Sequence, residues 1–434
     1  MPYASPCQRS PPLAPQHQSE GETPMSFTTE RRIAIVYEPE SVPLLKLTES
    51  AARNGFRPVW VAGHGDGRML GRLGSVVVTD GYSTAEIAAT LETFGVVGVT
   101  TFADSKIEQA AEIATLLGLP ANPAQKARLL VNKIAQRQAL ADAGVPGPRF
   151  VGIESPCDTS AARERLQMLD YPVVVKPAFG YGGRDTFCLP DFRAAAAELT
   201  IRCQADPWRP TIIEELLGDF PPRDRGGFGD YVSVEVVVDD GVPSVLAITG
   251  RMPLAEPFRE TGAFLPSSLC PAERSDVAAV AVKAALALGV HCGCLHIEIK
   301  LTAAGPQIIE VNGRLPGGGI TDLVATQVGV DLFECALNSA AGRPALRPLT
   351  SAAGVHYQLA LQPPLGRRVR LRPDWSTRLH AIAGVDHVAL RSTTGQVGLR
   401  DGSYGYLLMV NGLAEDHAAL LETYRQLNGL LVSD

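Results

Sequence analysis

The fold is decided by two segments, LHIEIKL at residues 295–301 and QIIEVNGR at residues 307–314. Each alternates apolar and polar residues, and this alternation predicts a strand with one face buried. The residues between the segments, AAGP at 303–306, predict a turn, so the two strands should form a hairpin. In that hairpin Glu298 lies nearly opposite Glu310, with both side chains on one face.

Oxygen atoms gather on that face of the predicted hairpin. Asn312 shares it because it follows Glu310 by two residues, and Arg314 comes where the strand gives way to a glycine-rich segment. Three oxygen donors suit a hard divalent cation, and magnesium prefers one or two carboxylates together with phosphate oxygens and water. A hairpin can instead carry two Glu residues toward solvent without a ligand, but like charges directly opposite each other are destabilising. The pattern therefore favours a metal and nucleotide site.

The composition limits the class of protein. The 434 residues are 45% apolar and 20% charged, which is typical of a soluble globular protein of two to four structural units. The net charge of −7 disfavours nucleic acid and anionic membranes, and no apolar run reaches the ~20 residues of a membrane span. We therefore expect no nucleic-acid partner, no membrane association and a cytoplasmic location. The eight cysteines are scattered, so we expect no disulfide framework or zinc site and interpret them as packing residues.

Four regions follow one another along the chain, and together they predict an α/β fold, α+β overall. Residues 1–30 are rich in Pro, Gln and Ser and are expected to be disordered, with Met25 as an alternative start. Residues 31–125 alternate strands and helices, which predicts a Rossmann-like domain with a small parallel sheet. Residues 126–345 form the core that contains the hairpin. Residues 346–434 contain short strands and glycine turns, which predict a separate β-rich subdomain.

A glycine-rich loop and two lysines precede the hairpin. We expect a basic helix from Lys126 to Ala143 that carries Lys133, and then a strand that ends at Lys176. Gly182 and Gly183 belong to the loop after that strand. Glycines let backbone N–H groups approach phosphate oxygens, and lysine supplies a positive charge. No Walker sequence follows, and a glycine-rich loop alone is more often an ordinary hairpin turn. With Lys133 and Lys176 before it and the carboxylate pair after it, the loop is interpreted as a flap over a triphosphate.

The segment TIIEELLG at 211–218 predicts a strand that ends in carboxylates. We interpret Glu214, Glu215 and Leu217 as the edge of an adenine pocket. There, backbone groups would bond the base, and a carboxylate would contact the exocyclic amine or the ribose hydroxyls. The alternative is a strand end that simply faces solvent.

In its order of motifs, the chain resembles the ATP-grasp superfamily over roughly residues 32–345. The motifs are VVVKP with the glycine loop, IEELLG, SVE, HIE and IEVNGR. Within the superfamily it is similar to carboxylate–amine ligases such as L-amino-acid ligases and carnosine-synthase-like enzymes, whose characteristic stretch resembles PFRETGAFLPS at 257–267. The resemblance implies an ATP-grasp fold with an N-terminal Rossmann-like domain, a two-part ATP-grasp core and a C-terminal β-rich subdomain.

The resemblance also implies roles for particular residues. Those implied for ATP are Lys133, Lys176, Gly182, Gly183, Glu214, Glu215 and Leu217. Those implied for one or two magnesium ions, or manganese in their place, are Glu298, Glu310 and Asn312. Arg314 would stabilise the acyl phosphate and the tetrahedral intermediate. Arg251 stands where relatives often have a lysine, which keeps the charge but changes the geometry. Glu235 matches a recurrent carboxylate, or else faces solvent on its strand.

The activity implied is ATP-dependent formation of an amide or peptide bond through an acyl phosphate, with release of ADP and phosphate. The substrates implied are amino acids or small carboxylates and an amine, in a secondary-metabolite pathway. Three alternatives stay open: a biotin-carboxylase-like reaction with bicarbonate, a purine-pathway ligase, and a nucleotide-binding regulator without catalysis. The oligomeric state is also open, with a homodimer as one option.

Overall fold

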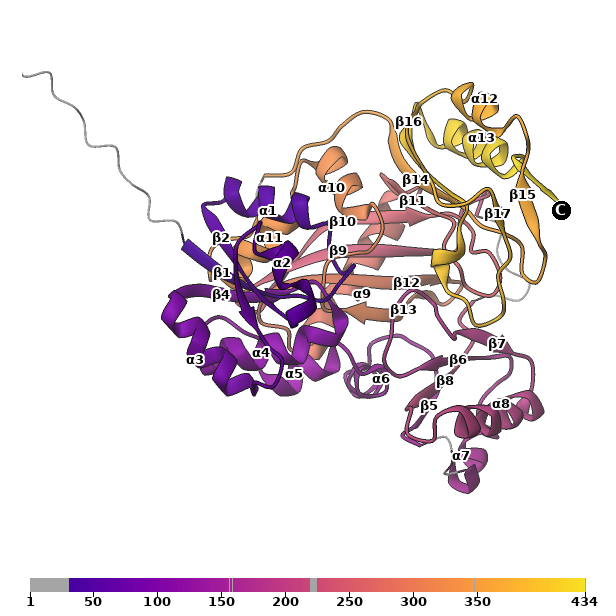
Figure 1. Ribbon diagram of the computed structural model, residues 1–434. Helices are drawn as coiled ribbons and strands as arrows, with labels where there is room; N and C mark the ends of the chain where they lie inside the picture. Colours follow the sequence, from indigo (N-terminus) through magenta and orange to yellow (C-terminus); the bar gives the residue numbers. More distant parts are fainter. Residues whose placement is uncertain (1–30, 156, 158, 219–224, 347, 434) are drawn as a thin grey trace, which may run out of the picture.

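The computed structural model describes residues 31–155, 157, 159–218, 225–346 and 348–433 (Figure 1). The predicted disordered tail, with Met25, lies outside the described residues. The described chain is divided among four sheets of four, four, eight and three strands. No helix in the described part is long and apolar enough to cross a lipid bilayer.

The N-terminal residues form a parallel sheet with strand order β3-β2-β1-β4, which confirms the predicted Rossmann-like arrangement. Its elements are β1 (Arg31–Val36), α1 (Leu44–Arg53), β2 (Phe56–Ala62), α2 (Gly67–Leu70), β3 (Ser75–Val78), α3 (Thr84–Phe94), β4 (Val96–Thr101) and α4 (Ile107–Leu116). Helix α3 begins at a capping box formed by Ser83 and Glu86 and ends at Gly95, whose positive φ closes the helix.

The basic helix expected from Lys126 to Ala143 is in fact two helices, α5 (Ala124–Leu129) and α6 (Lys133–Asp142). The reason is Asn132, whose side chain accepts hydrogen bonds from the backbone N–H groups of Ile134 and Ala135. An asparagine in this position caps a new helix in preference to continuing the old one. Lys133 is therefore the first residue of α6, facing the glycine-rich loop.

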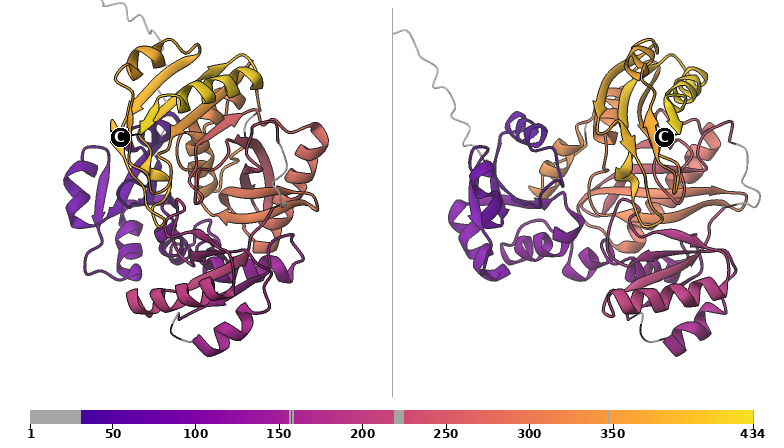
Figure 2. Two further views of the ribbon diagram at one scale, coloured as in Figure 1. Left: turned by 90° about the vertical axis from the view of Figure 1, so that its right-hand side faces the viewer. Right: turned by 45° about the vertical axis from the view of Figure 1, so that its right-hand side comes forward.

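A small unit follows α6, and it is built on an antiparallel sheet with strand order β5-β8-β6-β7. Its elements are β5 (Phe150–Ile153), α7 (Thr159–Leu166), β6 (Val173–Pro177), β7 (Phe187–Leu189), α8 (Phe192–Ala205) and β8 (Thr211–Glu215). The glycine-rich loop joins β6 to β7. Figure 2 shows this small unit (magenta) beneath the central sheet, apart from the N-terminal unit (indigo).

One expectation about the cysteines is wrong within this small unit. Cys157 and Cys203 form a disulfide with their Cα atoms 5.0 Å apart, although 46 residues separate them in the sequence. The chain folds back through β6 and β7 to bring α8 beside the start of α7, and nothing in the spacing of the two cysteines reveals this. Cys294 and Cys335 are buried in the core, in keeping with the interpretation as packing residues.

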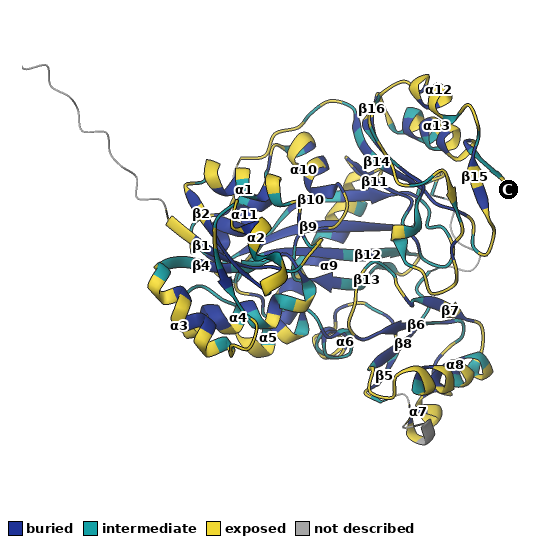
Figure 3. Cartoon of the chain, viewed as in Figure 1, coloured by how far each residue is buried: buried dark blue, intermediate teal, exposed yellow. Residues whose placement is uncertain are grey.

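The central sheet has eight strands in the order β13-β12-β9-β10-β11-β14-β18-β16. Its strands and the helices near them are β9 (Tyr231–Asp239), β10 (Val242–Arg251), β11 (Gly262–Leu265), α9 (Pro271–Leu288), β12 (Gly293–Thr302), β13 (Gly305–Asn312), α10 (Ile320–Val328), α11 (Leu332–Ala340), β14 (Val355–Leu361), β16 (Val385–Leu390) and β18 (Leu408–Ala414). Helix α9 covers one face of β9, β12 and β13 with apolar side chains. Most residues of these strands are buried (Figure 3).

The C-terminal residues are less separate than the sequence suggests, because β14, β18 and β16 extend the central sheet across the boundary predicted at residue 345. A three-stranded sheet lies beyond them, made of β15 (Val369–Leu371), β17 (Thr394–Gly395) and β19 (Leu431–Ser433), with helices α12 (Trp375–His380) and α13 (His417–Asn428). The division of the chain into domains stays a prediction, but its C-terminal strands share a sheet with the core.

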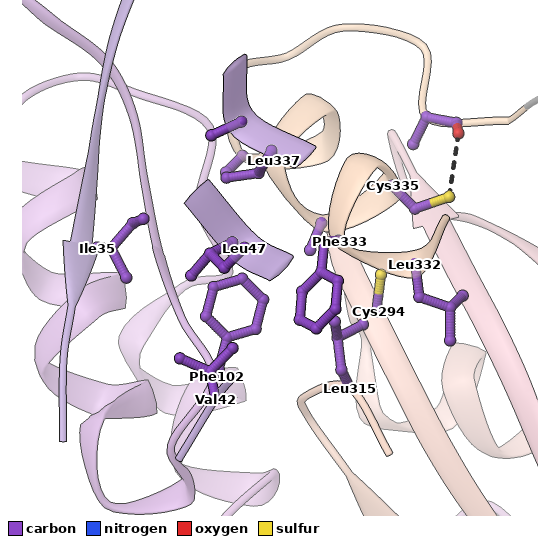
Figure 4. Packing of buried hydrophobic residues seen from close by; sticks show 14 of the residues in the cluster. Ile35, Val42, Leu47, Phe102, Cys294, Leu315, Leu332, Phe333, Cys335 and Leu337 are labelled. Carbon is purple, nitrogen blue, oxygen red and sulfur yellow. Dashed lines mark hydrogen bonds between the residues drawn. The ribbon is translucent and has the colours of Figure 1, made fainter. Parts of the chain in front are cut away.

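The N-terminal unit is held to the core by one apolar cluster that includes residues of β1, α1, β12 and α11. Figure 4 shows Leu47 and Phe102 from the N-terminal unit facing Phe333 of α11. The rings of Phe102 and Phe333 meet edge to face, with their centroids 5.8 Å apart. Cys335 also lies in this cluster, and its Sγ is 3.3 Å from the carbonyl oxygen of Ala345. This packing fixes the N-terminal unit beside the end of the hairpin at Arg314.

Candidate functional site

The hairpin forms as the sequence predicts. Glu298 of β12 is paired with Glu310 of β13, and His296 is paired with Asn312. A bulge follows Glu298, and the turn is shorter than expected because β13 begins at Gly305. Oxygen donors from two adjacent strands therefore lie together on one face of the central sheet.

A cavity of about 290 Å³ lies over this face, between the central sheet and the small unit. Twelve of the residues singled out from the sequence line it, and Glu235 is not among them. They are Lys133, Lys176, Gly182, Gly183, Glu214, Glu215, Leu217, Arg251, Glu298, Glu310, Asn312 and Arg314. They come from α6, from five strands and from segments that follow some of those strands, so the fold gathers residues spread over about 180 positions of sequence into one place.

Lysine and carboxylate side chains are already paired on the side of the cavity nearest the small unit. Lys176 is 2.7 Å from Glu214, and Lys133 is 3.0 Å from Glu310. Lys133 also donates a hydrogen bond to the carbonyl oxygen of Gly180 in the glycine-rich loop. Glu215 instead pairs with the guanidinium of Arg149 at 3.0 Å. Both lysines thus line the cavity, each paired with a carboxylate.

Arg137 is a residue of this site that the sequence reasoning missed. Its Nε donates to Glu214 at 2.8 Å, and its two terminal nitrogens donate to the carbonyl oxygens of Ile308 and Ile309. The arginine therefore ties the small unit to β13. Its position four residues after Lys133 places both side chains on one face of α6, and this spacing was a usable signal.

Glu214 is buried between two cations. Burial disfavours the charged carboxylate, but Arg137 and Lys176 outweigh it and lower the pKa of Glu214 from 4.5 to about 2. Because the folded pKa lies below the unfolded one, the stabilisation by this carboxylate is fully present above about pH 4.5. It is lost as the pH falls from about 4.5 to about 2, and it amounts to roughly 3 kcal/mol.

Glu214→Gln is therefore expected to be less stable than the unmodified protein at neutral pH, because two buried cations lose their counter-charge. Its melting temperature should also fall less steeply between about pH 5 and pH 3. Calorimetry across this range measures both effects. Glu422→Gln is the control, because Glu422 has a similarly lowered pKa but lies at the surface, where solvent screens its charge. If the melting temperatures of Glu214→Gln and of the unmodified protein fall in parallel as the pH is lowered, the lowered pKa of Glu214 is contradicted.

The candidate metal ligands are Glu298, Glu310 and Asn312. The amide nitrogen of Asn312 is 3.3 Å from the carbonyl oxygen of His296, so the amide oxygen is the atom left to bind a cation. In the described part of the chain, no three His, Cys, Asp or Glu side chains cluster to hold a metal ion. Two carboxylates and one amide are too few ligands for a protein-only site, but they suit a magnesium ion that is bound together with nucleotide phosphates.

His296 is the second residue that the sequence reasoning missed. Its Nδ1 is 2.9 Å from Glu235, and its Nε2 is 3.6 Å from Glu298. Burial opposes protonation, but Glu235 outweighs it and raises the pKa of His296 to about 9. Burial likewise opposes ionisation of Glu298, but the hydrogen bond and charge of His296, together with two arginines, lower the pKa of Glu298 to about 2. Glu235 is 1% exposed, so it does not face solvent.

Two arginines, Arg251 and Arg314, line the same cavity as Glu298 and Glu310. Arg251 pairs with Glu260 at 2.8 Å and donates to the hydroxyl of Ser233. Arg314 pairs with Asp104 at 3.0 Å, which links it to the N-terminal unit. Burial opposes the charge of each arginine, but the neighbouring carboxylates outweigh it, so the pKa of each is raised and both stay charged. The cavity thus combines fixed positive charge with carboxylate and amide oxygens.

The comparisons with known proteins agree with this geometry. Residues 225–322 match the family model of the ATP-grasp domain. Carnosine synthase 1 of Homo sapiens is 29% identical over 276 residues, which are 59% of this chain and 32% of that protein. Alanine–anticapsin ligase of Bacillus subtilis (strain 168) is 26% identical over 268 residues, which are 58% of this chain and 56% of that ligase. The chain spans less than two thirds of the length of both relatives.

A solved structure extends the likeness to almost the whole chain. L-amino acid ligase from Bacillus licheniformis has a TM-score of 0.70 to this structure at 20% identity. The match covers 93% of this chain and 99% of that ligase. The family match and this structure confirm the predicted resemblance and the fold.

Proposed function

We propose, from the ATP-grasp fold of this chain, that it is an ATP-dependent carboxylate–amine ligase. It would form an amide or peptide bond through an acyl phosphate and release ADP and phosphate. The observation that carries the proposal is the convergence of lysine, carboxylate and arginine side chains on one cavity, among them Lys133, Lys176, Glu298, Glu310, Arg251 and Arg314. Alanine–anticapsin ligase and L-amino acid ligase are both named for amino-acid substrates, so amino acids or small carboxylates are the proposed substrates.

The chemistry follows from charge. A carboxylate is a poor electrophile, so its oxygen attacks the γ-phosphorus of ATP, the bond to the β-phosphate breaks, and ADP leaves. The amine then attacks the acyl carbon, loses a proton, and phosphate leaves. Lys133 and Lys176 would hold the phosphates of ATP against the repulsion that builds up in the first step. A magnesium ion held by Glu298, Glu310 and Asn312 would offset further phosphate charge.

The second step places its own demands on the site. Negative charge develops on the acyl oxygen when the amine attacks, and a fixed cation in a dry site stabilises such charge. Arg314 is proposed for this position, and Arg251 is proposed to bind the transferred phosphoryl group. Water must be kept away from the acyl phosphate, so the glycine-rich loop would close the cavity during turnover.

Several finer points accompany this proposal. A cytoplasmic location, a homodimer, a role in secondary metabolism and magnesium as the resident metal stay predictions. The biotin-carboxylase-like and purine-pathway reactions use the same phosphate chemistry and are outcomes that the experiment below distinguishes.

The test is an assay of the protein with ATP, magnesium and a pool of amino acids. Phosphate release is measured, and new masses are sought by mass spectrometry. The proposal predicts ADP, phosphate and a product whose mass equals that of two pool members minus one water. Phosphate release only with bicarbonate and biotin, or only with a ribosyl phosphate amine, would replace the proposal by one of the alternatives. No phosphate release under any condition would favour a regulator.

A further inference from the structure

The glycine loop (residues 178–186, between β6 and β7) is held from outside the small unit. Its partner is the C-terminal loop (residues 398–406, between β17 and β18), which reaches toward β7 in Figure 1. The backbone N–H of Asp185 donates to the carbonyl of Arg400 at 2.9 Å, and the backbone N–H of Ser403 donates to the carbonyl of Gly182 at 2.9 Å. Two backbone hydrogen bonds therefore join loops that are more than 200 residues apart.

Arg400 adds a charged contact to this junction. Its guanidinium pairs with the carboxylate of Asp185 and with both oxygens of Glu198, at 2.9 and 2.8 Å. It also lies over the ring of Phe187, 5.0 Å from the centroid. Asp185 and Glu198 are buried, and Arg202 of α8 pairs with both. Arg400 thus enters a charge network of the small unit although it belongs to the C-terminal region.

The two loops are too close for side chains at the contact. A Cβ atom on Gly402 would lie 2.3 Å from the carbonyl oxygen of Gly182, and a Cβ on Gly182 would lie 2.7 Å from the ring of Tyr404. Gly402 has a φ of −88°, which any residue can adopt, so it is the close approach that requires glycine there. The fit is therefore specific to this relative position of the loops.

The C-terminal loop also reaches the cavity. Ser403 and Tyr404 line it beside the glycine loop. The hydroxyl of Ser403 accepts a hydrogen bond from the backbone N–H of Glu260, whose carboxylate pairs with Arg251. One short loop thus contacts the glycine loop, the cavity and the partner of a proposed catalytic arginine.

We propose that Arg400 is a positioning residue that holds the glycine loop over the cavity. It acts through Asp185 and Glu198, and it touches neither ATP nor the reacting atoms. Its importance for catalysis rests on the proposed function, but its hold on the glycine loop does not. A loosened glycine loop admits water, so the acyl phosphate would be hydrolysed and ADP would form without product.

Amide hydrogen exchange of peptides from the glycine loop, in the protein without nucleotide, tests the hold directly. Arg400→Ala removes the charged contacts to Asp185 and Glu198, and Gly402→Ala forces a Cβ atom against the carbonyl oxygen of Gly182. Each variant should therefore speed this exchange by about 10-fold. Arg425→Ala is the matched control: it breaks an exposed pair with Glu422 in the same region, away from the cavity. Unchanged exchange of the glycine loop in both Arg400→Ala and Gly402→Ala would overturn the proposal.

Activity gives a second readout. Arg400→Ala should raise the KM for ATP by about 10-fold and raise the ratio of ADP to amide product, and Arg400→Lys should partly restore both. Unchanged coupling of ADP to product in Arg400→Ala, despite faster exchange, would overturn the positioning role. If the unmodified protein forms no amide product while both variants still show faster exchange, the proposed function fails and the hold on the loop stands.

Discussion

Glu310→Gln is expected to lower the rate of ADP formation by about 1000-fold while the protein stays folded. Glutamine has nearly the same shape, and its amide oxygen can still accept a hydrogen bond from Lys133, which is 3.0 Å from Glu310. What is lost is the negative charge that faces Glu298 across the hairpin and would bind magnesium. Initial rates at saturating ATP, with melting temperatures, measure the effect.

The control for this change is Glu415→Gln, which neutralises an exposed glutamate outside the cavity. It should leave the rate unchanged. A titration with magnesium separates the causes further, because a weakened metal site needs a higher concentration of the ion for the same rate. Full turnover of Glu310→Gln at low magnesium would remove Glu310 from the metal site.

Arg314→Ala is expected to lower kcat by about 100- to 1000-fold and to change the affinity for ATP little. The reason is that the guanidinium is proposed to act on charge that appears only when the amine attacks the acyl carbon. Steady-state rates with ATP binding measured by calorimetry separate the two quantities. A loss of ATP binding that accounts for the whole effect would place Arg314 on the nucleotide instead.

Asp104→Asn tests whether the position of Arg314 matters as well as its charge. Asp104 holds Nε of Arg314 at 3.0 Å, and asparagine can still accept that hydrogen bond but carries no charge. A modest loss of kcat, smaller than that of Arg314→Ala, is the expected result. A loss as large as that of Arg314→Ala would mean that the ion pair to the N-terminal unit is itself required.

Much of the fold follows from local pattern. Alternation in β12 and β13 predicts the hairpin, and the spacing alone places Glu298 opposite Glu310. The predicted alternation of strands and helices in residues 31–125 is clear in β3, α3 and β4 because turn and cap residues flank them. The gathering of twelve residues around one cavity was not visible in spacing, and it came from the order of motifs that resembles a known superfamily.

The rest depends on contacts between distant segments. His296 has Glu235 as its partner only because β9 pairs with β12 in a register that sets the two residues opposite each other. The disulfide of Cys157 requires the fold-back of the small unit. The C-terminal strands join the central sheet through β11 and β14, a pairing that their own short patterns do not specify. Arg400 likewise pairs with Asp185, which lies far from it in the sequence.

The most direct test of the ligase account is oxygen transfer from the acid to phosphate. The protein is given ATP, magnesium and pooled amino acids labelled with ¹⁸O in their carboxylates, and the released phosphate is analysed by mass spectrometry. Attack of the carboxylate on the γ-phosphorus predicts that each phosphate formed together with amide product carries one ¹⁸O atom. Unlabelled phosphate, or release of AMP and pyrophosphate, would contradict the acyl phosphate and with it the proposed function.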